Sequence, residues 1–240
     1  MTENCMKTNY KIHFAIAIML LALFAGFTAL VASADVQPVG PDNTKIGFAT
    51  LNKSVFDTLG TSDTWYKVTG VIGIFAILEV GLFCLWGFVQ LIKRKNFFRI
   101  DHRILMLVLL YAAVALAYLI FEVKVINYRP VLVDGAIEAS YPSSHTLLTI
   151  ATAVSSAMAL HGLIPEKKGL IVAADLFFAA ISVAMVVGRL LSGVHWLTDI
   201  IGGVLLAVAL CQLYYASVKL VEAKRPKLLF GAENGHPKGE

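Results

Sequence analysis

Six stretches of the chain are almost entirely apolar, and each is long enough to cross a lipid bilayer. They cover residues 12–33, 68–92, 104–121, 145–163, 170–187 and 197–218. A helix rises about 1.5 Å per residue, so about 20 apolar residues span a hydrocarbon core of about 30 Å. The pattern therefore predicts an all-α protein, a six-transmembrane-helix bundle that forms a single domain over residues 1–240.

The positions of the basic residues predict how these helices are oriented. The loop after the second span concentrates positive charge, with Lys93, Arg94, Lys95, Arg99 and Arg103. Short loops rich in Lys and Arg stay in the cytoplasm. Six spans then place both the N- and the C-terminus in the cytoplasm. The far, extracytoplasmic side receives the connections 35–66, 122–144 and 188–196.

The first span and the connection after it raise two further expectations. Residues 32–34, Ala-Ser-Ala, resemble a signal-peptidase site, but the apolar run before them is longer than a usual signal core. We therefore expect an uncleaved first helix. Within 35–66, apolar residues fall at helical spacing, at Phe48, Leu51, Val55, Phe56 and Leu59. This spacing predicts a short amphipathic helix that lies on the outer membrane surface.

The composition agrees with a membrane protein and argues against several other classes. The chain is 58% hydrophobic and 15% charged, with a mean hydropathy of +0.75, which is too apolar for an ordinary soluble domain. Its net charge of +4 is sorted by loop, so it indicates topology and not nucleic-acid binding. Cys5, Cys84 and Cys211 lie far apart, so they predict neither a disulfide framework nor a metal site.

One short stretch between the fifth and sixth spans carries the strongest chemical signal. It contains Arg189, His195 and Asp199, and the last two are four residues apart, so on a helix they would share one face. An Asp held against one imidazole nitrogen fixes the tautomer and makes the other nitrogen a better base or nucleophile. The guanidinium of Arg189 suits a phosphate. Taken singly, a His or Arg at a membrane interface is more often an anchor, so the chemical interpretation depends on the further stretches below.

A second candidate stretch is Pro142-Ser143-Ser144-His145, at the start of the fourth span. Proline favours the first turn of a helix, and the free N–H groups that follow it form an anion site at the positive end of the helix. The hydroxyls of Ser143 and Ser144 would add donors, although serines also simply begin helices. His145 would bring a second imidazole to the membrane face that carries His195.

These residues predict phosphate chemistry with a division of labour. His195 would attack phosphorus, His145 would protonate the leaving oxygen, and water would hydrolyse the phosphohistidine. Arg129, which precedes a proline, Arg189 and Lys124 would stabilise the charge of the transition state. A metal site is the competing explanation for paired histidines, but it would need a third or fourth protein ligand.

Together the three stretches resemble the signature of the type 2 phosphatidic acid phosphatase superfamily of membrane lipid phosphatases. That signature has a Lys and an Arg-Pro pair, then Pro-Ser-Gly-His, then Ser-Arg, five residues, His, three residues and Asp. The second part is matched here by Pro142, Ser143 and His145. The third part is matched, with the family spacing, by Arg189, His195 and Asp199.

The chain departs from that signature at three positions. Ser144 replaces the Gly of the second part, and Gly188 replaces the leading Ser of the third. The family places its Lys seven residues before the Arg, where this chain has Glu122. Lys124 precedes Arg129 by only five residues, which on a regular helix would turn it about 140° away from the Arg.

The resemblance implies six helices and hydrolysis of a phosphomonoester or diphosphate without metal or cofactor, at the outer leaflet. His195 would be the nucleophile, Asp199 its orienter and His145 the proton donor. The phosphate-binding residues would be Arg129, Arg189, Ser143, Ser144 and Lys124. The hypothesis is an enzyme of a bacterial plasma membrane that removes a terminal phosphate from a lipid, with no obligate protein partner. Candidate lipids are undecaprenyl diphosphate, phosphatidylglycerol phosphate and phosphatidic acid.

Two alternatives stay open at this point. A phosphotransferase on the same scaffold would pass the phosphate to a second lipid. A transporter would only bind an anion, and it would need polar residues near the bilayer centre, where the sequence offers little beyond Glu79. For Glu79, and for Asp175 near the start of the fifth span, we expect structural roles.

Overall fold

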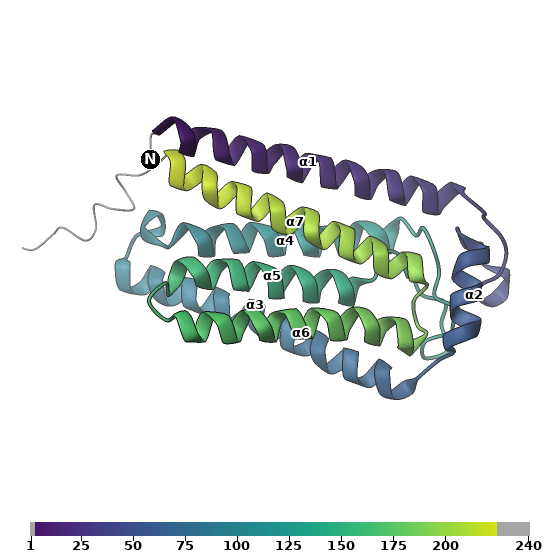
Figure 1. Ribbon diagram of the computed structural model, residues 1–240. Coiled ribbons are helices and arrows are strands. Elements are labelled where there is room, and N and C mark those ends of the chain that lie inside the picture. Colours follow the sequence, from purple (N-terminus) through teal and green to yellow (C-terminus); the bar gives the residue numbers. More distant parts are fainter. Residues whose placement is uncertain (1–2, 225–240) are drawn as a thin grey trace, which may run out of the picture.

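The computed structural model describes residues 3–224, with side chains from Tyr10 onward, and this part of the chain is helical without any extended strand (Figure 1). The elements are α1 (Glu3–Ser33), η1 (Pro41–Asn43), α2 (Ala49–Leu59), α3 (Asp63–Arg94), η2 (Phe97–Arg99), α4 (His102–Val123), α5 (Ser144–Leu163), α6 (Lys168–Ser192) and α7 (Leu197–Lys224). All but α2, η1 and η2 are long and apolar enough to cross a membrane.

Each of the six predicted spans lies inside one of these helices, so the prediction of a six-span all-α bundle is confirmed. The helices extend past the apolar stretches because local signals place their ends. The side chain of Ser62 accepts a hydrogen bond from the N–H of Trp65 at the start of α3, and Asp101 caps α4 in the same way. At the other end of α6, Gly193 has a φ of 68°, the left-handed conformation that terminates helices.

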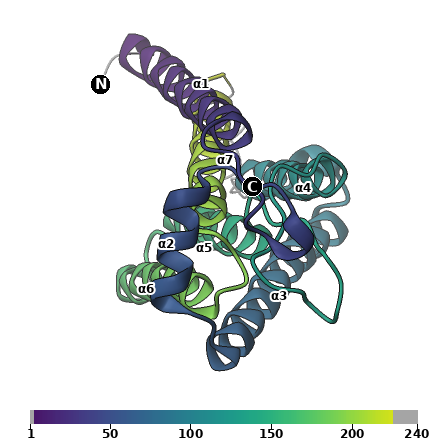
Figure 2. The ribbon, with the colours of Figure 1, turned by 90° about the vertical axis from the view of Figure 1, so that its right-hand side faces the viewer.

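The middle of the bundle is α5, which packs against α3, α4, α6 and α7. The end-on view in Figure 2 shows α1 on the outside, where it runs along α7. Many large apolar side chains on α1, α3, α4 and α6 remain more than half exposed, among them Ile18, Phe75, Leu109 and Leu176. Such a surface requires a surrounding apolar solvent, which a lipid bilayer provides.

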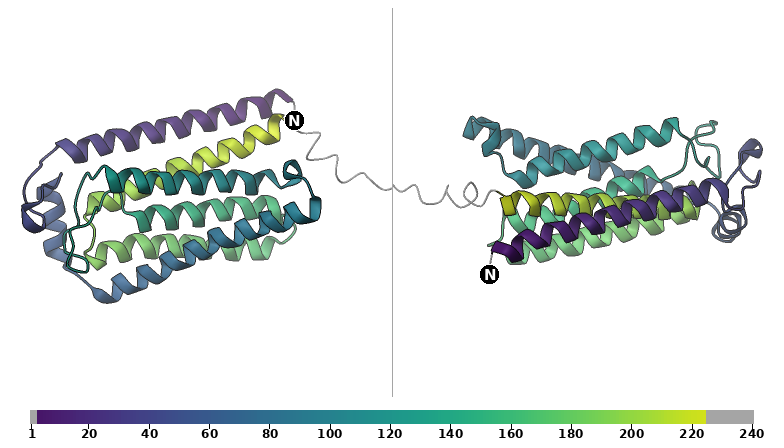
Figure 3. Two further views of the ribbon diagram at one scale, coloured as in Figure 1. Left: turned by 180° about the vertical axis from the view of Figure 1, so that it is seen from behind. Right: turned by 90° about the horizontal axis from the view of Figure 1, so that it is seen from above.

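One end of the bundle carries α2 and the connection between α4 and α5, as the view from behind in Figure 3 shows. We call this the site end. The first residues of α1 and the last residues of α7 lie at the opposite end (Figure 1). The basic loop between α3 and α4 is also at that opposite end, so the charge pattern still predicts that it faces the cytoplasm.

The connection 35–66 contains α2, where a short helix was predicted. Side chains of α2 contact residues of the site end. Phe56 of α2 packs against Trp196 at a tilted angle, with ring centroids 5.6 Å apart. Asn52 is 1% exposed and bonds both the Thr198 hydroxyl, at 2.9 Å, and the Thr198 N–H, at 3.2 Å. Leu51 and Leu59 remain 45% and 40% exposed. That these leucines touch the membrane surface stays a prediction.

The two acidic residues inside the spans have different surroundings. Asp175 of α6 forms an ion pair with His161 of α5 across 2.9 Å, and both side chains are partly exposed. Glu79 of α3 lies beside the hydroxyls of Thr152 and Ser156, on the inner face of α5. Both contacts join neighbouring helices, in line with the structural roles that we expected.

We predict that Asn52→Ala destabilises the protein by about 1–3 kcal/mol, because it leaves the Gly47 carbonyl and the Thr198 N–H buried without their amide partner. Thermal unfolding in detergent would measure this as a lower midpoint. Lys53→Ala is the matched control, since its exposed ion pair with Asp57 contributes little. Equal midpoints for the two variants would show that α2 does not brace the start of α7.

Candidate active site

The residues singled out in the sequence come together at the site end. His145 lies in the first turn of α5, Arg189 in the last turn of α6, and Asp199 in the first turn of α7. Arg129 comes from the connection between α4 and α5. Arg129 and Arg189 lie near enough to both histidines to act electrostatically on them. One group of side chains is therefore assembled from four separate parts of the chain.

His195 and Asp199 do not share a helix face, contrary to the expectation drawn from their spacing. His195 precedes α7, which begins at Leu197, so the i, i+4 geometry of a helix does not apply to the pair. The distance from His195 Nδ1 to Asp199 Oδ2 is 3.8 Å, too long for a hydrogen bond. The hydroxyl of Ser140 lies between them, 2.9 Å from His195 Nδ1 and 2.5 Å from Asp199 Oδ2.

The Asp199 carboxylate is completely buried and accepts hydrogen bonds on both oxygens. Oδ2 accepts from the N–H of Trp196 at 2.9 Å as well as from Ser140, and Oδ1 accepts from the Asn127 side-chain amide at 3.3 Å. Sequence reasoning missed Ser140 and Asn127, because nothing in the local pattern links residues that lie 59 and 72 positions from Asp199.

The environment of His195 favours the neutral imidazole. Its side chain is 1% exposed, and burial holds the pKa of His195 well below its ordinary value of about 6.5. The positive charges of Arg189 and Arg129 lower the pKa further. Nε2 is buried and has no hydrogen-bond partner among the described residues. A neutral imidazole with a free Nε2 is the form that attacks phosphorus.

Arg189 is the largest fully buried side chain of the described residues, at 0% exposure. One guanidinium nitrogen, Nη1, donates to the Thr69 hydroxyl of α3 at 3.3 Å, and the guanidinium carbon lies 5.7 Å from the centre of the Tyr66 ring. Nε and Nη2 are buried and donate to no group in the described part of the chain. A buried cation with free donors is an anion-binding group, because its charge otherwise stays uncompensated.

Two glycines let α3 approach this region closely. A Cβ added at Gly188, where the family signature has Ser, would lie 2.6 Å from a methyl carbon of Thr69. A Cβ at Gly73 of α3 would lie 2.9 Å from the His145 ring. The Gly188 departure therefore has a packing reason, since this chain brings α3 against α6 at the position of the missing side chain. Sequence reasoning did not assign α3 to the site.

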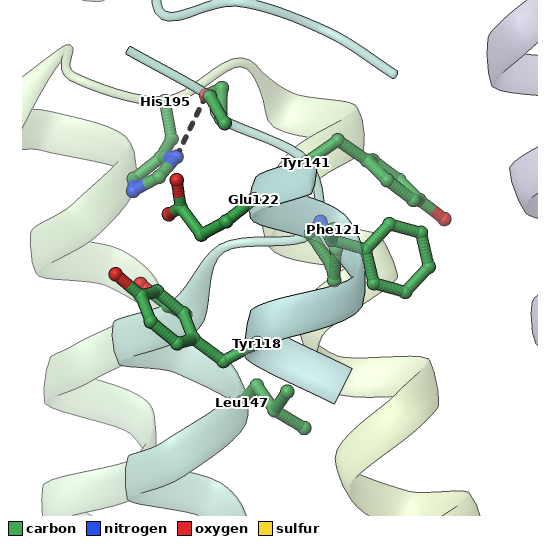
Figure 4. A pocket seen from close by; sticks show the side chains of 10 residues that line it. Tyr118, Phe121, Glu122, Tyr141, Leu147 and His195 are labelled. Carbon is green, nitrogen blue, oxygen red and sulfur yellow. Dashed lines mark hydrogen bonds between the residues drawn. The ribbon is translucent and has the colours of Figure 1, made fainter. Parts of the chain in front are cut away.

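The first part of the signature has an arginine but no inward lysine in this chain. Arg129 Nε is 3.2 Å from Glu138 Oε2, and the backbone N–H of Arg129 bonds the carbonyl of Glu138. Lys124 follows the end of α4 and is exposed. Glu122, two residues earlier and in the family's lysine position, lines a small cavity of about 20 Å³ together with His195 (Figure 4).

The two serines of the second stretch differ in surroundings. Ser143 is the N-cap of α5, and its buried oxygen accepts from the Thr146 N–H at 3.5 Å and from the Thr146 hydroxyl at 3.0 Å. Its own proton remains available as a donor. Ser144 lines the same cavity as Glu122. Their contact with a phosphate stays a prediction. Within residues 3–224, no group of three or more His, Cys, Asp or Glu could hold a metal ion.

Comparison with known proteins finds a family profile and a solved structure that are similar to this chain. Residues 108–222 match the sequence profile of the PAP2 superfamily. The fold is similar to the crystal structure of the first transmembrane PAP2-type phosphatidylglycerolphosphate phosphatase from Bacillus subtilis, with a TM-score of 0.57 and 17% sequence identity. The similarity covers 83% of this chain and 93% of that one. A search of curated protein sequences finds no match.

We predict that His195 stays neutral in the ligand-free protein as the pH falls below 6.5, and that Arg189→Gln raises its pKa by removing a nearby charge. Nitrogen-15 NMR of histidine-labelled protein in detergent would follow the titration, with His195→Gln identifying the signal. The unfolded chain protonates this residue more readily, so it lowers the free energy of unfolding as the pH drops below about 6.5. Protonation of His195 at its ordinary pKa would contradict the prediction.

Proposed function

We propose that this chain is a membrane lipid phosphatase of the PAP2 superfamily, whose profile matches residues 108–222, and that it works through a phosphohistidine. One observation supports this above the others. Nε and Nη2 of Arg189 and Nε2 of His195 are buried without a hydrogen-bond partner among the described residues, and Arg189, Arg129 and His145 all act electrostatically on His195. A phosphoryl group satisfies these groups together, because its oxygens accept from arginine while its phosphorus meets the nucleophile.

The proposed reaction has two steps. The Nε2 lone pair of His195 attacks phosphorus and forms a P–N bond, while the bond from phosphorus to the leaving oxygen breaks. In the complex, the negative charge of the bound phosphate favours the protonated form of His145, which gives its proton to the leaving oxygen of the lipid alcohol or phosphate. His145 then takes a proton from water, whose oxygen attacks phosphorus and breaks the P–N bond. Inorganic phosphate is released, and both imidazoles return to their starting forms.

The charges of the site suit the transition state of this transfer. The equatorial oxygens of the phosphoryl group carry the negative charge, and Arg129 and Arg189 supply fixed positive charge at the histidines. Because Arg189 is fully buried, its attraction for the phosphoryl oxygens is weakly screened by water. Most of the catalytic effect would therefore come from charges that are in place before the substrate arrives.

A lipid substrate follows from the position of the site at a helix end. The small cavity at His195 is lined on one side by Tyr118, Phe121 and Leu147, which belong to α4 and α5 (Figure 4). Tyr118 is 47% exposed on the outer face of α4, so the cavity adjoins the surface that we assign to the membrane. A lipid headgroup could reach His195 from this side while its chains stay between the bundle and the bilayer. By the charge pattern, we place this end at the outer leaflet.

We predict that His195→Ala abolishes phosphate release from detergent-solubilised lipid phosphates, with the thermal midpoint preserved. The wild-type enzyme quenched in base should carry acid-labile phosphate on His195, and the variant should carry none. His161→Ala is the matched control, because His161 lies at the opposite end of α5 and pairs with Asp175. A panel of phosphatidic acid, phosphatidylglycerol phosphate and prenyl diphosphates would identify the preferred lipid.

Two further measurements separate this proposal from its alternatives. Added chelator should leave the rate unchanged, whereas strong inhibition would favour metal catalysis. An added lipid acceptor should not capture the phosphate, whereas its phosphorylation in place of phosphate release would identify a transferase. Full hydrolysis by His195→Ala would end the proposal altogether.

A further inference from the structure

Ser140 is the residue through which Asp199 reaches the nucleophilic histidine. Its side chain is 3% exposed, and its Oγ is 2.9 Å from His195 Nδ1 and 2.5 Å from Asp199 Oδ2. The direct separation of the histidine and the aspartate is 3.8 Å. Within the described chain, the serine hydroxyl is the group that makes hydrogen bonds to both.

The protons of this bridge can be assigned from the partners of Asp199. Two oxygens 2.5 Å apart need a proton between them, and the carboxylate already accepts from the Trp196 N–H and the Asn127 amide. The Ser140 hydroxyl therefore donates to Asp199. Its oxygen is then left as an acceptor, so Nδ1 of His195 must carry the proton of the second bond. That tautomer leaves the lone pair on Nε2.

The backbone around Ser140 is fixed by contacts on both sides. Its N–H donates to the carbonyl of Asn127 at 2.9 Å, and Asn127 also holds Asp199 through its side chain. The next residue, Tyr141, is 1% exposed, and its ring fills the space above Gly202, where a Cβ would lie 2.5 Å from it. The backbone that carries the hydroxyl is thus held in place by contacts on both sides of Ser140.

We infer that Ser140 is a positioning residue that sets the tautomer of His195 and couples it to Asp199. This inference rests on the proposed function, in which His195 is the nucleophile. As the imidazole bonds to phosphorus it becomes positively charged, and the Nδ1–H bond to the serine strengthens. The serine in turn strengthens its bond to the carboxylate, so the charge of Asp199 is felt at His195 through a hydroxyl.

The test compares Ser140→Ala with Ser140→Thr, which keeps the hydroxyl, and with Ser217→Ala, which removes a partly buried hydroxyl of α7 bonded to the Leu213 carbonyl. In ligand-free protein, nitrogen-15 NMR should show a single Nδ1–H tautomer of His195 in wild type and Ser217→Ala. Ser140→Ala should show a mixture of both tautomers. Its kcat should fall about 10- to 100-fold with little change in KM, the range seen when a partner of an active-site imidazole is removed.

Retention of the single tautomer and of kcat in Ser140→Ala would overturn the inference, since Asp199 would then act directly. If Ser140→Ala does not fold, Ser140→Cys preserves the volume with a weak donor and should show the same mixed tautomers. The tautomer is read without substrate, so it remains informative if His195→Ala proves to be active and the proposed reaction is wrong.

A separate observation concerns the substrate that this site accepts. Glu122 stands where the family signature has a lysine, and Figure 4 shows its carboxyl group on the His195 side of α4. It is exposed at the rim of the cavity that His195 lines. Replacing lysine by glutamate changes the charge there by two units. A second acid, Glu138, already occupies one side of Arg129.

We propose that Glu122 makes the enzyme select lipid monophosphates over lipid diphosphates. This also rests on the proposed function and narrows its substrate class. The buried arginines receive the phosphoryl group being transferred, whereas an additional phosphate would lie towards the rim, in the field of the Glu122 carboxylate. Each further negative charge is repelled there, and the repulsion is weakened but not removed by solvent.

Geranylgeranyl phosphate and geranylgeranyl diphosphate form a matched pair, because they share one chain and differ in one phosphate. Wild type should favour the monophosphate in kcat/KM. Glu122→Gln should shift the ratio towards the diphosphate by about ten-fold, and Glu122→Lys should shift it further. Asp134→Asn, which neutralises an exposed carboxylate at the tip of the connection between α4 and α5, should leave the ratio unchanged.

An unchanged ratio in both Glu122 variants, or a wild-type preference for the diphosphate, would overturn this second proposal. The same ratio can be measured as Kd for the two lipids in His195→Ala, where no turnover occurs. That measurement keeps the proposal testable if neither lipid is hydrolysed, a result that would count against the proposed function instead.

Discussion

The buried charge of Arg189 is the constraint on which the rest of the site depends. Removing an ion from water costs several kcal/mol, and a partner of opposite charge usually offsets this cost. Here the guanidinium has a hydroxyl and an aromatic ring as neighbours, and the nearest charge that acts on it is Arg129, of the same sign. Two of its nitrogens remain free in the region of His195. A phosphoryl group brings the missing charge and acceptors.

The packing of α3 against α6 follows from the same constraint. Thr69 gives its own proton to the carbonyls of Trp65 and Tyr66, so its oxygen is left to accept from Arg189. It can come this near because position 188 is glycine. The hydroxyl that the family signature carries at position 188 is thus replaced by one from another helix. In the sequence, Gly188 looks like the loss of a hydroxyl, but in the structure Thr69 of α3 brings a hydroxyl to Arg189.

Hydropathy was enough to predict the six helices, because each span is one run of about 20 apolar residues. The order of the spans also predicted that Arg129, His145, Arg189 and His195 share one end of the bundle, since antiparallel helices return to the same face. What the sequence could not provide were partners across long separations. Thr69 lies 120 residues from Arg189, Asn52 lies 146 from Thr198, and their residue types carry no signal of the pairing.

The positions of His195 and Asp199 show why their spacing alone gave a wrong prediction. They are four positions apart in the sequence, but α7 begins between them, and the gap between their side chains is too wide for a direct hydrogen bond. Ser140 fills this gap, and the arrangement has a consequence for phosphate chemistry. The carboxylate accepts from the Trp196 N–H and from Asn127 as well as from Ser140. In the proposed reaction, the positive charges of Arg129 and Arg189 would therefore act on the phosphoryl group at Nε2, while Asp199 would act through Ser140.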